Sequence, residues 1–131
     1  MDADTRQRIV DRAGDRCEYC HLPQFAVDLT LHIEHIIAKQ HGGGDEDENL
    51  ALACDRCNHQ KGPNLSSIDR ATQTVVLLFH PRRDKWDEHF QFQAADIVGT
   101  TPTGRATVEL LQMNSSHRRS LRAVLRATGE M

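Results

Sequence analysis

Four cysteines form two pairs with the same spacing, Cys17-x-x-Cys20 and Cys54-x-x-Cys57, and they are all the cysteines of the 131-residue chain. Thiolates from two such pairs can complete the tetrahedral shell of one Zn²⁺, and four protein ligands leave no position open for a substrate. The pattern therefore predicts a structural zinc ion. Two redox-active pairs or chance free thiols are the alternative interpretation, and a reducing compartment weakens it.

A second group of chemically capable residues lies between the cysteine pairs. Glu34 and His35 interrupt the apolar run LHIEHII, residues 31–37, which is typical of a strand. A neutral histidine is suited to accept a proton near neutral pH, and Mg²⁺ prefers oxygen ligands such as a carboxylate. Asn58 offers a further oxygen directly after the second cysteine pair. These residue types could activate a water for hydrolysis beside one bound Mg²⁺ or Mn²⁺.

The stretch LHIEHIIAKQHGGGDEDENLALACDRCNHQKG, residues 31–62, resembles the signature of the HNH endonuclease family. The resemblance places the acid–histidine pair on Glu34 and His35, the loop asparagine on Asn49 and the third polar position on Asn58. The chain thus looks like a His-Asn-Asn variant. The resemblance implies that His35 is the general base and that Glu34 and Asn58 hold the catalytic ion. It also implies that Asn49 holds the loop and fixes the orientation of His35.

The chain departs from the common family pattern at two positions. The family commonly has aspartate where this chain has Glu34, and it often has histidine where this chain has Asn58. His59 is therefore an alternative for the third position. Later stretches, such as LLFHPRRDKWDEHF, resemble a recurrent bacterial subgroup of small HNH proteins, so the resemblance covers nearly the whole chain. It implies an α+β fold: a ββα-metal finger with zinc knuckles, plus C-terminal strands and helices packed on it.

The elements that must position these residues follow from residue type and periodicity. In the N-terminal half we expect a helix over 5–13, a strand over 29–37, a glycine- and acid-rich loop, and a short helix after the second cysteine pair. In the C-terminal half we expect a strand over 74–81, a hairpin over 90–93 and 96–99, a helix over 104–114 and a last helix over 116–128. We place Leu121, Val124 and Leu125 on one face of that last helix, with Arg118, Arg119, Arg122 and Arg126 largely elsewhere.

The length favours one domain over residues 1–131. Within it we expect an HNH core over about residues 14–64 and an extension over about residues 65–131.

Charge is unevenly distributed although the net charge is only −3. Acidic residues dominate the centre and arginines the two ends, which fits a protein that binds phosphates and cations; solvated helix faces would give the same clusters. Lys61, Arg82 and Arg83 are candidate contacts to nucleic acid, with DNA the expected partner. Trp86 beside them could grip nucleic acid, but we favour a role as an aromatic core anchor.

The chain has no apolar run of the ~18 residues that a membrane span needs, and its first residues lack the apolar segment of a signal peptide. We therefore expect a cytoplasmic protein with no membrane partner. The alternative to a nuclease is a catalytically silent, zinc-stabilised module that binds nucleic acid or another protein.

Overall fold

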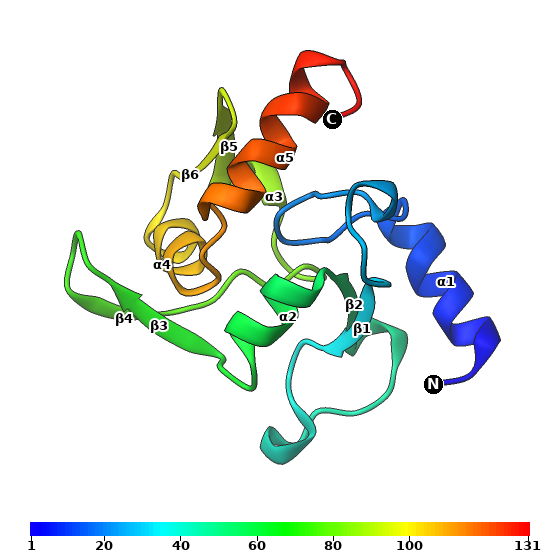
Figure 1. Cartoon of the computed structure of the whole chain (residues 1–131). Helices are drawn as coiled ribbons and strands as arrows, with labels where there is room; N and C mark the ends of the chain where they lie inside the picture. Colours follow the sequence, from blue (N-terminus) through cyan, green and yellow to red (C-terminus); the bar gives the residue numbers. More distant parts are fainter. The chain divides into compact units, whose positions relative to one another are not determined.

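The computed structural model describes residues 1–131, and their contacts divide the chain into two compact units, Met1–Pro63 and Asn64–Met131. Five α-helices and three two-stranded antiparallel sheets make up these units, which confirms the expected mixed helix and strand class (Figure 1). The division falls where the HNH core and the extension were expected to meet. The expectation of a single domain stays a prediction.

The first unit starts with helix α1 (Ala3–Ala13), two residues longer than expected at its N-terminal end. Asp2 caps it by accepting a hydrogen bond from the backbone N–H of Thr5 at 2.7 Å, which satisfies one of the free amides of the first turn. Gly14 ends the helix in the left-handed conformation, at φ 65°. The helix buries Ile9 completely.

The centre of this unit is a short hairpin followed by a helix, the ββα order that the family resemblance implied. Strand β1 (His32–His35) pairs antiparallel with β2 (Leu50–Ala53), and helix α2 (Asp55–Lys61) follows. All four side chains of β2 are buried, so this strand supplies much of the core. The strand expected over 29–37 is therefore shorter, and it ends at the acid–histidine pair.

The arginines of α1 bind main-chain and loop groups of their own unit. Arg6 donates to the carbonyl of Leu31 at 2.7 Å, and Arg8 pairs with Asp47 at 2.9 Å. Arg12 donates to the carbonyl oxygens of Asp47 at 3.0 Å and Leu50 at 2.5 Å. These contacts tie α1 to the residue before β1 and to the segment that enters β2, so the three arginines have partners within their own unit.

The second unit begins with a hairpin of β3 (Ser66–Asp69) and β4 (Thr74–Leu77). The strand expected over 74–81 is shorter and ends at Leu77, because the residues that follow leave the two-stranded ladder. The backbone N–H of Phe79 donates to the Thr107 hydroxyl at 3.0 Å instead of to a ladder partner.

In the rest of this unit the expected hairpin and last helix are present. The helix expected over 104–114 starts two residues earlier and ends four residues earlier, and a short helix over 86–89 was not expected. The elements are α3 (Trp86–His89), the hairpin of β5 (Phe90–Gln93) and β6 (Asp96–Gly99), α4 (Pro102–Leu110) and α5 (Ser116–Ala127). The ring of Trp86 lies 5.1 Å from that of Phe90 and 5.2 Å from that of Phe92, as an aromatic anchor would. None of the helices in either unit is both long and apolar enough to span a membrane.

Helix α5 corrects one sequence expectation, because its buried face carries arginines. Arg118 and Arg122 are 1% and 0% exposed, whereas Val124 is 64% exposed. Arg118 donates to the carbonyl oxygen of Leu111, and Arg122 donates to that of Met113, just beyond the C-terminal end of α4. Carbonyl groups near a helix end lack intrahelical donors, and the two guanidinium groups satisfy them.

Candidate functional site

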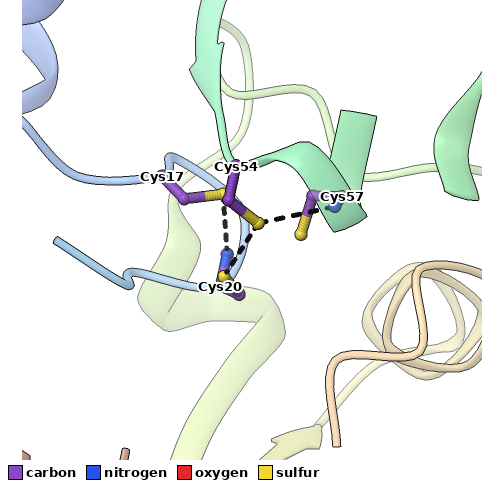
Figure 2. A group of neighbouring side chains, drawn as sticks. All are labelled: Cys17, Cys20, Cys54 and Cys57. Atoms are coloured by element: carbon purple, nitrogen blue, oxygen red, sulfur yellow. Dashed lines mark hydrogen bonds between the residues drawn. The ribbon is translucent and has the colours of Figure 1, made fainter. Parts of the chain in front are cut away.

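The four cysteines converge on one buried point of the first unit, as Figure 2 shows. Their sulfur atoms all lie within 4.8 Å of one another, and the Sγ atoms of Cys20 and Cys54 are 3.7 Å apart. Tetrahedral Zn²⁺ with Zn–S bonds near 2.3 Å requires sulfurs roughly 3.8 Å apart. Backbone amides of Cys20 and Cys57 donate to the first sulfur of each pair, at 3.5 and 3.4 Å. The arrangement fits one four-thiolate metal site.

Burial makes the thiol cluster a poor place for unpaired charge. It raises the pKa of the Cys17 and Cys57 thiols, while a hydrogen bond with Cys17 lowers the pKa of Cys20. Four thiolates can share so small a buried volume only if a cation compensates their charge. The chemistry of the donor set therefore fits Zn²⁺ better than two separate redox pairs.

Glu34 lies in the interior of the same unit, with 5% of its surface exposed. Tyr19, which stands between the cysteines of the first pair, donates its hydroxyl proton to Glu34 Oε1. The ammonium nitrogen of Lys61 is 3.7 Å from Glu34 Oε2 and donates to the carbonyl of Ile36 at 2.9 Å. Burial raises the pKa of Glu34, and the Lys61 charge opposes this shift. Glu34 is thus a buried carboxylate with a partner on each oxygen.

His35, the next residue, lies at the surface end of β1. Its side chain is 24% exposed, and its Nε2 lies 2.7 Å from Oδ1 of Asp45 in the glycine-rich loop. The hydrogen bond with His35 lowers the pKa of Asp45, and Lys39, whose Nζ is 3.4 Å away, lowers it further. The histidine is therefore partly exposed to solvent and held by a loop carboxylate.

An open pocket of about 450 Å³ in this unit brings the predicted residues together. Glu34, His35 and Asn58 all line it, and so does His59. Successive residues of a strand point to opposite faces, but β1 ends at His35, so the chain leaves the pleat there. Asn58 and His59 reach the pocket from α2, and the geometry leaves both as candidates for the third position.

Asn49 lies outside this pocket and holds the loop that follows β1. Its Oδ1 accepts the backbone N–H of Ile37 at 2.9 Å, and its Nδ2 donates to the carbonyl oxygens of Ile37 at 3.0 Å and Gly44 at 2.8 Å. Position 43, which lies against Ile37 and the Asn49 side chain, has room only for glycine. A Cβ there would lie 1.7 Å from the Ile37 carbonyl oxygen. One buried side chain thus joins both ends of the loop.

The candidate nucleic-acid contacts have different surroundings. Lys61 is 2% exposed, so its ammonium group serves Glu34 and Ile36 rather than the surface, which corrects the expected phosphate contact. Arg82 and Arg83 lie in the second unit, where their backbone amides donate to Nδ1 of His80. The Arg83 side chain is exposed. Contact of these two arginines with nucleic acid stays a prediction.

The structure adds two residues that sequence reasoning missed, Tyr19 and Asp45. Tyr19 is the only tyrosine of the chain and stands inside the first cysteine pair, a position that could have drawn attention to it. Asp45 is one of several acidic residues in its loop, and no sequence signal separates it from its neighbours. His32, two residues before Glu34, pairs with Asp55 at 3.3 Å and does not line the pocket.

The comparison with family models matches residues 17–64 to the model described as HNH endonuclease. The comparisons with curated proteins and with solved structures gave no match. The matched segment starts at the first cysteine and contains both cysteine pairs, β1, β2 and α2. Residues 17–64 of this chain are therefore an HNH endonuclease domain, with four cysteines positioned for a metal site as in zinc-binding members of that family.

Proposed function

We propose that the chain is a metal-dependent endonuclease that hydrolyses phosphodiester bonds, with DNA as its substrate. HNH domains act on nucleic acids, generally DNA, and the match supports nuclease or nucleic-acid-binding activity. The observation that carries the catalytic proposal is the shared pocket of Glu34, His35 and Asn58. A binding module needs no histidine, carboxylate and amide around one open cavity.

The donor set suits a hard cation such as Mg²⁺ or Mn²⁺. The Asn58 side chain is partly exposed and lines the pocket, so its amide oxygen is available. A carboxylate can accept about four hydrogen bonds or ligand contacts, and Tyr19 and Lys61 use only part of the capacity of Glu34. A bound ion would relieve negative charge on the phosphate and on the departing 3′ oxygen.

The remaining roles fall to the side chains of the chain itself. His35 takes the proton of the attacking water, because a neutral imidazole is a competent base near pH 7. Asn49 positions His35 by holding the loop on both sides, and the cysteine-bound zinc is structural. The expected products carry a 5′ phosphate and a 3′ hydroxyl, as the family resemblance implies.

Nicking of supercoiled plasmid tests the proposal, with Mg²⁺ or Mn²⁺ added to or omitted from a zinc-containing buffer. Omission is preferable to a chelator, which would also remove zinc. We expect metal-dependent nicking that falls by about 10²- to 10⁴-fold in His35→Ala. His32→Ala is the matched control, since this histidine lies on the same strand but outside the pocket. Undiminished nicking by His35→Ala would refute the assignment.

Two further comparisons separate the alternatives within the same assay. Asn58→Ala and His59→Ala, each assayed over a range of Mg²⁺ concentrations, show which residue supports the ion, because its loss raises the Mg²⁺ requirement. Wild-type protein that retards DNA on a gel but never cuts it would favour the silent binding module.

A further inference from the structure

We propose that Asp45 is a second positioning residue of the active site, beside Asn49: its carboxylate holds the Nε2–H of His35, which leaves Nδ1 as the atom that takes the proton of the attacking water. The inference rests on the proposed nuclease function. It adds a residue that the family resemblance did not supply, and it names the reacting atom of the base.

The chemistry of the contact determines where the ring proton lies. Asp45 Oδ1 is 2.7 Å from His35 Nε2, a distance typical of a charge-assisted hydrogen bond. An ionised carboxylate can only accept, so Nε2 must carry the hydrogen. A neutral imidazole has one N–H and one bare nitrogen. Nδ1 of His35 is therefore left with a free lone pair.

Contacts of Asn49 and Lys39 restrain the loop segment that carries Asp45. Asn49 binds the Gly44 carbonyl, directly before Asp45, and both backbone polar groups of Ile37, two residues after His35. One amide side chain therefore ties the segment that carries the base to the segment that carries the carboxylate. Lys39 lies 3.4 Å from the same Asp45 oxygen, which adds a second restraint on the carboxylate.

Such a contact would act in the chemical step. As the water attacks, its O–H bond breaks and the proton moves to Nδ1, while a new P–O bond forms. The bond from phosphorus to the 3′ oxygen breaks, and the departing oxygen takes a proton from solvent. The ring then carries a positive charge, which the adjacent carboxylate stabilises, while the hydrogen bond keeps the ring oriented.

A solvated surface pair is the competing interpretation, since the Asp45 side chain is 62% exposed. Long-range ¹H–¹⁵N spectra of the His35 ring, recorded on the zinc-loaded chain in mildly alkaline buffer, separate the two. His35→Ala identifies the signal among the eight histidines. We expect a single tautomer with the hydrogen on Nε2 and a bare Nδ1.

Two substitutions and one control complete the spectroscopic test. Asp45→Ala should remove the slow solvent exchange of the Nε2–H, and Asp45→Asn, whose NH₂ can donate to Nε2, should move hydrogen to Nδ1. Glu48→Gln makes the same charge change at an exposed site near the loop and should leave the ring signals unchanged. Wild-type spectra with Nδ1–H, or ring signals that Asp45→Ala does not alter, would overturn the proposal.

Kinetics supply the second readout. Asp45→Ala should lower kcat about 10- to 100-fold, a typical part of a general-base contribution, with KM within about twofold of wild type. An unchanged kcat overturns the positioning role even if the tautomer is as expected. An inactive wild type overturns the nuclease function itself, and with it any catalytic meaning of the contact. If the wild type is active but its His35 ring shows no single tautomer, the role of Asp45 is overturned and the nuclease function stands.

Discussion

The buried ion pair of Lys61 and Glu34 makes a prediction that can be worked out in detail. In Lys61→Met the side chain keeps its unbranched shape but loses the ammonium group. The two side chains are 2% and 4% exposed, so water cannot replace the lost partner. Removing one member of a buried pair typically costs about 3–5 kcal/mol, because the other charge stays behind. We expect a loss in this range at pH 7 for the Met1–Pro63 unit.

In the variant, Glu34 can bind a proton instead of staying charged, and the cost of this protonation sets an upper limit on the loss of stability from the unpaired charge. A glutamate in the unfolded chain has a pKa of about 4.3. Keeping Glu34 protonated in the folded variant at pH 7, about 2.7 pH units higher, therefore costs nearly 4 kcal/mol. At pH 5.5 the same limit is only about 1.6 kcal/mol. The Ile36 carbonyl also loses its donor, which adds about 1 kcal/mol at either pH.

The sign of the pH dependence follows from the direction of the shift. Burial raises the pKa of Glu34, and loss of Lys61 raises it further because that charge opposes the shift. An acid with a raised pKa binds its proton more tightly when folded, so the stability deficit grows as pH rises. The difference between wild type and Lys61→Met should therefore be smaller at pH 5.5 than at pH 7, by up to about 2 kcal/mol.

Urea unfolding in zinc-containing, magnesium-free buffer measures the effect. The amide signal of buried Leu52 in β2 reports the first unit, and fluorescence of Trp86, the only tryptophan, reports the second in the same samples. The paired variant Glu34→Gln/Lys61→Met removes both charges and should lose less stability than Lys61→Met alone. A loss below about 1 kcal/mol, or one independent of pH, would refute the reasoning.

Three further predictions concern other parts of the chain. Purified protein should contain one zinc ion per chain, and the Cys54→Ser variant should lose this ion and unfold Met1–Pro63. Metal analysis combined with circular dichroism measures both effects, and a stable metal-free chain would contradict the prediction. Asn49→Ala, which removes three hydrogen bonds at a buried site, should cost about 2–4 kcal/mol and speed amide exchange in its loop. The hydrogen bond with Arg105 is the main reason why the pKa of Asp69 is lowered to about 2. The ionised carboxylate should therefore stabilise the fold fully above pH ~4, and this stabilisation should disappear as the pH falls toward 2. Carboxyl NMR checks the midpoint, which Arg105→Gln should raise.

Sequence alone was sufficient for the features that depend on local spacing. Two cysteine pairs with a common spacing predicted one metal site, and their sulfurs meet at one point. Turn residues, caps and periodicity located most helices and strands, because these signals act within a few residues of one another. The family resemblance over 31–62 named Glu34, His35 and Asn58, which the fold then brings to one pocket.

Only the tertiary structure decided where the cations of the chain lie. Amphipathic patterns assign lysine and arginine to the surface because burying a charge is costly. Lys61 and Arg122 are nevertheless buried, since both donate to carbonyl oxygens of other segments and Lys61 also pairs with Glu34. Those carbonyls belong to the backbone, whose positions the pattern of side chains does not reveal.

The partners of the acid–histidine pair were equally beyond the sequence. Tyr19 reaches Glu34 from the first cysteine pair, and Asp45 reaches His35 across the glycine-rich loop. The family resemblance proposed Glu34 and His35 as the two groups that carry the chemistry, and this stays a prediction. Chain closure around the cysteine cluster and the Asn49 amide decided what holds each group in place, because both contacts join segments that are close only in the folded chain.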